Sequence, residues 1–77
     1  MKKELRSLKS REVERILLQA GFKFESQKGS HCKYVGTIKG ETRKVTMIAN
    51  QERFAIDTLK SMIRQSCLSE EEWLALK

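Results

Sequence analysis

The fold is decided by residues 22–49, FKFESQKGSHCKYVGTIKGETRKVTMIA, in which polar and apolar side chains alternate in three successive runs. Alternation with a period of two is typical of β-strands that bury one face and expose the other. Turn sequences lie between the runs, around Gly29 and around Gly40. The stretch therefore predicts an antiparallel meander with one apolar face and one polar face.

The alternation also assigns individual side chains to the two faces of the expected sheet. In residues 31–38, His31 and Lys33 share one face, which we expect to be exposed to solvent. The residues expected on the apolar face are Phe22, Phe24, Cys32, Tyr34, Ile38, Val45, Met47 and Ala49.

Helical periodicity flanks the three runs. Residues 10–21 repeat apolar side chains at i, i+3, i+4 and i+7, with Ser10 expected as the N-cap and Gly21 as a left-handed end. The helical pattern resumes in residues 56–67, and Ser69 with Glu72 forms a capping-box sequence that predicts a short final helix. We therefore expect an α+β fold in the order helix, three-stranded antiparallel sheet, helix, short helix, with one sheet face left free for a ligand. The apolar positions are Val13, Ile16, Leu17 and Ala20 in the first helix, and Ile56, Leu59, Ile63 and Cys67 in the second.

Length and composition limit the classes of protein. The 77 residues are enough for one small domain, which we expect to span residues 1–77. A chain that is 39% hydrophobic and 34% charged, without a long apolar run, is not typical of a disordered tail or a membrane protein, and we expect it in the cytoplasm.

The net charge of +6 is unevenly distributed. Residues 21–44 carry six basic and two acidic side chains, a net +4, whereas residues 69–77 carry one basic and three acidic side chains, a net −2. Such a basic segment favours a polyanionic partner, although solubility alone also explains a positive charge.

The only histidine of the chain, His31, follows the first turn and lies between Lys28 and Lys33. Histidine can accept or release a proton near neutral pH, and a nearby ammonium group can stabilise negative charge on a phosphorane. Gly29 permits close approach of the backbone to a phosphate, and Ser30 adds a hydroxyl donor. This cluster is compatible with a site that cleaves RNA with the substrate's own 2′-hydroxyl as nucleophile, without a metal or another cofactor. The alternative is an ordinary solvated histidine without a catalytic role.

Other polar and aromatic residues have two interpretations each. Arg43 and Lys44 are further candidate RNA contacts, or solvated strand charges. Trp73 is expected in the core, with an exposed anchor for a protein partner as the alternative. Cys32 and Cys67 lack the spacing of a zinc site, and we expect free thiols.

Taken together, these segments resemble the HicA family of toxin mRNA interferases, also described as YcfA-like proteins. Residues 12–22, EVERILLQAGF, are similar to the opening helix of the family and its Ala-Gly-Phe ending. Residues 27–31, QKGSH, with Tyr34, resemble its active-site motif. Val45-Thr46, Thr58-Leu59 and residues 68–72, LSEEE, are similar to its third strand, second helix and closing helix, so the resemblance covers residues 10–76.

The resemblance implies a fold like that of double-stranded-RNA-binding domains, and the toxin of a type II toxin-antitoxin system that cleaves mRNA and halts growth in stress responses. The catalytic histidine of the family corresponds to His31, and a HicB-type antitoxin is expected to cover it. Many members have a Pro and then a His after the third-strand Val-Thr, where this chain has Ile48 and Asn50. Any role of that second histidine is therefore absent here.

Two other functions fit the residues alone. In the first alternative, the chain is a non-catalytic RNA-binding module, in which His31 only contacts a phosphate or sugar. In the second, it is a protein-interaction module whose positive charge serves an acidic partner. RNA binding without cleavage would identify the first, and the absence of RNA affinity at moderate salt the second.

Overall fold

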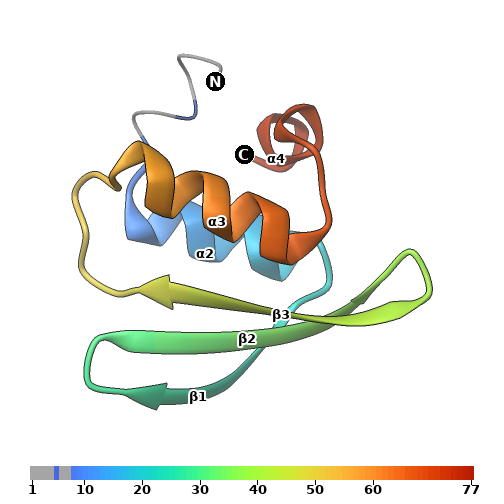
Figure 1. Cartoon of the computed structure of the whole chain (residues 1–77), viewed down its shortest axis with the longest axis horizontal. Coiled ribbons are helices and arrows are strands. Elements are labelled where there is room, and N and C mark those ends of the chain that lie inside the picture. Colours follow the sequence, from blue (N-terminus) through green and yellow to red (C-terminus); the bar gives the residue numbers. More distant parts are fainter. Residues whose placement is uncertain (1–4, 6–7) are drawn as a thin grey trace.

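The computed structural model describes Leu5 and residues 8–77, and it confirms the predicted α+β fold. Helices α2 and α3 lie on the same face of a three-stranded sheet and leave the other face uncovered (Figure 1). No helix among these residues is long and apolar enough to cross a membrane. The elements are α2 (Ser10–Gln19), β1 (Lys23–Lys28), β2 (His31–Ile38), β3 (Glu41–Ile48), α3 (Ile56–Ser66) and α4 (Glu70–Leu76).

The sheet is the predicted antiparallel meander, with strand order β1-β2-β3. Two-residue turns join the strands. Gly29 has a φ of 60°, and Lys39 and Gly40 have φ values of 54° and 83°. Positive φ at the first or at both central residues is the hairpin geometry that matches the right-handed twist of the strands. These short turns leave each strand pair a single register.

The prediction of a buried face on the first strand was wrong. Every residue of β1 is exposed, and Phe24 retains 50% of its side-chain exposure. β1 lies at the edge of the sheet and carries a bulge between Phe24 and Ser26. Phe24 instead packs edge-on against the ring of Tyr34, with centroids 5.9 Å apart. Phe22 is buried as expected, but it lies before the strand.

The end of α2 fixes how the chain enters the sheet. Gly21 has a φ of 103°, its N–H donates to Leu18 O at 3.1 Å, and the Phe22 N–H donates to Leu17 O at 2.9 Å. This pair of bonds is a Schellman motif, which confirms the predicted left-handed end. Phe22 then packs so closely on Gly36 that a Cβ there would lie 3.0 Å from the Phe22 Cα. Position 36 therefore has no room for a side chain.

Ser10 does not cap α2 as predicted. The N-cap is Lys9, whose N–H donates to Glu12 Oε1 at 3.0 Å. Ser10 is the first helical residue, and its Oγ accepts from the Gln51 N–H at 3.1 Å while its own N–H donates to Gln51 O at 2.9 Å. Ser10 therefore attaches the loop after β3 to the start of α2.

The apolar face of α3 is rotated relative to the predicted stripe. Ile56 is 42% exposed, and Cys67 ends the helix in a left-handed conformation with a φ of 63°. Both cysteine thiols are free, as predicted. The buried face of α3 therefore does not include Ile56, the first residue of the predicted stripe. The buried residues of α3 are Leu59, Met62, Ile63 and Ser66.

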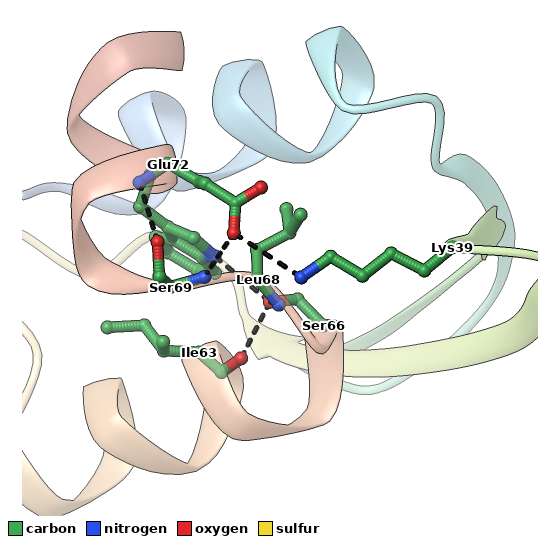
Figure 2. A network of polar contacts seen from close by, with 7 residues as sticks. Lys39, Ile63, Ser66, Leu68, Ser69 and Glu72 are labelled. Atoms are coloured by element: carbon green, nitrogen blue, oxygen red, sulfur yellow. Dashed lines mark hydrogen bonds and ion pairs between the residues drawn. The ribbon is translucent and has the colours of Figure 1, made fainter.

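Ser66 connects α3 with α4 inside the core. Its Oγ donates to Ile63 O at 2.6 Å and accepts from the Leu68 N–H at 3.2 Å (Figure 2). The indole N–H of Trp73 also donates to this oxygen, at 3.0 Å, and Trp73 is fully buried. The core position predicted for Trp73 is confirmed, and the alternative of an exposed anchor was wrong.

The capping box at the start of α4 is confirmed. The Ser69 N–H donates to Glu72 Oε1 at 2.9 Å, and the Glu72 N–H donates to Ser69 Oγ at 3.1 Å (Figure 2). These bonds hold the pKa of the Glu72 carboxyl below its ordinary value. Glu72 also lies 3.7 Å from the ammonium group of Lys39, so α4 contacts the β2–β3 turn.

Tyr34 joins the sheet to α2. Its hydroxyl donates to Glu14 Oε2 at 2.5 Å, and its side chain is 2% exposed. Burial, and then the hydrogen bond to the Glu14 carboxylate, raise the pKa of the Tyr34 phenol above its ordinary value of 10.0.

Replacing the buried hydroxyl of Ser66 should destabilise the protein. Ser66→Ala leaves the Trp73 indole N–H and the Leu68 N–H without their acceptor, and we expect the free energy of unfolding to fall by about 1–3 kcal/mol. Denaturant unfolding followed by Trp73 fluorescence measures this. Ser61→Ala is the matched control, since Ser61 lies on the same helix and its hydroxyl has no partner among the described residues. Equal stability of the two variants would contradict the account.

The raised pKa of the buried, hydrogen-bonded Tyr34 predicts a stability loss at alkaline pH. Because the folded pKa is raised, this contribution is complete below the unfolded pKa of about 10 and is lost as pH rises beyond it. Urea unfolding across this range should show the wild type losing its advantage over Tyr34→Phe. Phenolate absorbance of the single tyrosine reports the ionisation directly. A stability difference that stays constant with pH would contradict the raised pKa of Tyr34.

Candidate functional site

His31 is the first residue of β2 and is exposed. Along β2 the exposed His31 alternates with the buried Cys32 and Tyr34, so its side chain lies on the sheet face opposite to theirs. Helices α2 and α3 do not cover that face, which we call the outer face (Figure 1). The cross-strand partner of His31 on β1 is Lys28, and on β3 it is Ile48. Cα atoms of such partners are about 5 Å apart, so Lys28 lies beside the imidazole.

Lys33 is the next outer-face residue of β2. It is two residues from His31, or about 7 Å along the strand, and it is exposed. Neither Lys28 nor Lys33 has an acidic partner in the described part of the chain. We call Lys28, His31 and Lys33 the outer-face cluster. The structure therefore brings together the histidine and the two lysines that the sequence pattern indicated.

The turn before His31 is fixed on both sides. The Gln27 side-chain amide donates to Gly29 O at 2.9 Å, and the Ala49 N–H donates to Ser30 O at 2.8 Å. Because Gly29 has a φ of 60°, a larger residue there would be strained. The turn thus presents exposed backbone and the Ser30 hydroxyl directly beside the outer-face cluster.

Lys44 lies on the outer face but farther from His31. It pairs across the strands with Val35, four residues along β2 from His31, which corresponds to about 13 Å. Its ammonium group is 3.7 Å from the carboxylate of Glu25, which partly neutralises it. Lys44 therefore extends the basic surface without joining the outer-face cluster.

Arg43 lies on the opposite, inner face. Its cross-strand partner is Gly36, and its guanidinium contacts the carboxylate of Glu41. The Nε atom of Arg43 is buried and has no hydrogen-bond partner among the described residues. The structure does not bring Arg43 together with His31. The alternation itself indicated this, since Arg43 and the buried Val45 are two residues apart.

Helix orientation adds positive potential at the same end of the molecule. Figure 1 shows α2 and α3 beginning at the end of the sheet where the β1–β2 turn lies. The free N–H groups of a helix N-terminus carry a partial positive charge.

Within Leu5 and residues 8–77, no group of three His, Cys, Asp or Glu side chains is placed to hold a metal ion.

A groove of about 890 Å³ opens on the inner side of this end, between the start of α2, the sheet and the loop after β3. Sequence reasoning missed it, because its walls come from four separate segments and no single motif marks it. Asn50 was noted only as a departure from the family pattern. The groove is lined by Lys9, Ser10, Arg11, Glu12, Glu14, Gln27, Cys32, Met47, Ala49, Asn50, Gln51 and Glu52.

Residues 10–68 match the family model described as the HicA toxin of bacterial toxin-antitoxin systems. No curated protein matched the chain. The matched range contains α2, the whole sheet with the outer-face cluster, and α3, whereas α4 lies beyond it. The chain therefore belongs to the HicA toxin family.

Proposed function

We propose that this toxin is an endoribonuclease that cleaves mRNA, with residues 1–77 acting as one cytoplasmic domain and His31 as the catalytic base. One observation carries the proposal. His31 is exposed on the uncovered sheet face, between two lysines that have no acidic partner in the described structure. Membership in a toxin family supports a role in halting growth under stress.

The proposed reaction is an internal transesterification. The neutral imidazole of His31 takes the proton of a 2′-hydroxyl, the 2′-oxygen attacks the adjacent phosphorus, and the bond to the 5′-oxygen breaks. The products are a 2′,3′-cyclic phosphate and a 5′-hydroxyl. Lys28 and Lys33 stabilise the charge on the non-bridging oxygens. The nucleophile belongs to the substrate, so the reaction requires neither metal nor cofactor.

Protonation of the leaving 5′-oxygen has three candidate sources. The chain has no second histidine, and Asn50 occupies the position where many family members carry one. Water, a lysine, or His31 itself in a stepwise route remains to supply the proton. A base alone contributes about 10²- to 10⁴-fold to the rate.

Binding is proposed to follow the phosphate backbone. The outer face presents Lys28, Lys33 and Lys44, and also Lys23, whose cross-strand partner is Val35. A basic strand surface of this kind recognises the shape of an RNA backbone rather than its bases. The Gly29 backbone and the Ser30 hydroxyl add donors at the turn.

The second proposed partner is a HicB-type antitoxin. An acidic surface placed over His31, Lys28 and Lys33 would satisfy the same lysines that bind phosphate. Antitoxin and RNA would then compete for one face, which explains inhibition without any change in the fold of the toxin.

Removing the imidazole should abolish cleavage. We expect His31→Ala to cut labelled RNA in EDTA at least about 10²-fold more slowly than the wild type, because the base is lost. Gel analysis of the fragments, with identification of the 2′,3′-cyclic phosphate ends, measures this. Fluorescence of the buried Trp73 verifies the fold. Full activity of a folded His31→Ala protein would rule out the assignment.

The same experiment separates the two alternatives. RNA binding without cleavage by the wild type would identify a non-catalytic RNA-binding module. The absence of both binding and cleavage at moderate salt would identify a protein-interaction module with an acidic partner.

Salt dependence tests phosphate binding. With four lysines on phosphates, log affinity for a 2′-O-methyl RNA, which cannot be cleaved, should fall with log salt at a slope of about −2.8 to −3.6. Lys33→Ala should make this slope shallower by about 0.7 to 0.9, because one phosphate contact is lost. Lys60→Ala, an exposed lysine on α3, is the control and should leave the slope unchanged. A flat dependence in the wild type would contradict phosphate contacts on this face.

A further inference from the structure

The groove at the His31 end lies directly behind the outer-face cluster. Its wall includes Gln27 and Cys32, which are cross-strand partners and adjoin the Lys28 and His31 pair. An RNA strand whose phosphate contacts His31 therefore needs only to pass the Gly29 turn to reach the groove. The groove volume of about 890 Å³ is within the range of sites that enclose small ligands, about 300–1,000 Å³.

The floor of the groove is apolar. Cys32 and Met47 are cross-strand partners, with 6% and 3% of their surface exposed, and Ala49 is half-buried beside them. Thiol and thioether sulfur atoms make favourable contacts with aromatic rings. This floor suits a flat aromatic group rather than a charged one.

The walls of the groove present hydrogen-bond acceptors at fixed positions. One carboxylate oxygen of Glu14 accepts from the Tyr34 hydroxyl at 2.5 Å, and the other has no partner among the described residues. The Gln27 amide nitrogen is bound to Gly29 O at 2.9 Å, so its carbonyl oxygen is oriented too. Tyr34 thus holds an acceptor over an apolar floor.

The charges of the groove disfavour phosphate inside it. Three carboxylates line it, from Glu12, Glu14 and Glu52, against two cationic side chains, those of Lys9 and Arg11. The ammonium group of Lys9 is 3.6 Å from the carboxylate of Glu52, so the groove keeps a net negative charge. Carboxylates repel phosphate but accept from the amino groups of bases. The phosphates are therefore placed on the outer face and the base is turned inward.

We propose that this groove holds one unpaired nucleobase of the RNA, within two nucleotides of the cleaved bond, and that Glu14 accepts from its exocyclic amino group. The inference rests on the proposed function and adds a specificity site to it. Cytosine, adenine and guanine carry such an amino group. Uracil presents its N3–H between two carbonyl oxygens, which the carboxylate repels. Single-stranded RNA exposes these base edges for reading.

Sequencing of the 5′-hydroxyl ends from a randomised single-stranded RNA tests the preference. The wild type should deplete uracil about tenfold at one position within two nucleotides of the cut. Glu14→Gln keeps an oxygen for Tyr34 but presents an amide donor to the groove, so the depletion should vanish or reverse. Glu41→Gln, on the distant β2–β3 hairpin, is the control and should retain it. Cleavage by the wild type without any base bias would overturn the proposed nucleobase site in the groove while leaving the proposed function intact.

A binding measurement tests the proposed nucleobase site in the groove independently of cleavage. In NMR titrations, cytidine 5′-monophosphate should shift the side-chain amides of Gln27 and Asn50 more strongly than uridine 5′-monophosphate does. Glu14→Gln should remove that difference, and Glu41→Gln should not. Equal shifts with both nucleotides, or shifts confined to the outer-face cluster, would overturn the inference. Failure of the wild type to cleave RNA would instead contradict the proposed function.

Discussion

The register of β2 between its two neighbours is the constraint on which the rest of the structure depends. Side chains alternate across a strand, so a slip of one residue would move His31 and Lys33 into the core and expose Cys32 and Tyr34. The two-residue turn at Gly29 prevents that slip by pairing Lys28 with His31. Burial of Cys32 and Tyr34 enforces the same register from the inner face. Core packing and the candidate site are therefore fixed by a single alignment.

The helices provide the inner layer that makes this alignment stable. Tyr34 is bound to Glu14 on α2, and Ser66 and Trp73 connect α3 with α4, so each helix is joined to the core by a specific polar contact as well as by apolar burial. The Thr46 N–H at the β3 edge donates to Gln65 Oε1 at 3.0 Å, which also attaches α3 to the sheet. Helices α2 and α3 leave the outer face uncovered, and the same Tyr34 that contributes to the core also holds the Glu14 carboxylate at the groove.

Much of this arrangement was predictable because local signals agreed with the tertiary structure. Period-two alternation located β2 and its two faces, glycines located the turns and the end of α2, and Ser69 with Glu72 located the start of α4. The predictions that were wrong depended on long-range information. Periodicity does not reveal that β1 lies at an edge, and nothing near Ser10 indicates Gln51 as its partner. The groove combines four segments, so it exists only after folding.

The central claim is that RNA binds the uncovered sheet face and places a phosphate at His31. Because the chain has a single histidine, one imidazole signal reports on this site. NMR titration with a short 2′-O-methyl RNA tests the claim most directly. The account predicts that the His31 ring resonances and the side-chain resonances of Lys28 and Lys33 move together, while the indole signal of the buried Trp73 stays in place. Unchanged His31 signals, with shifts confined to Lys60 and Arg64 on α3, would contradict it.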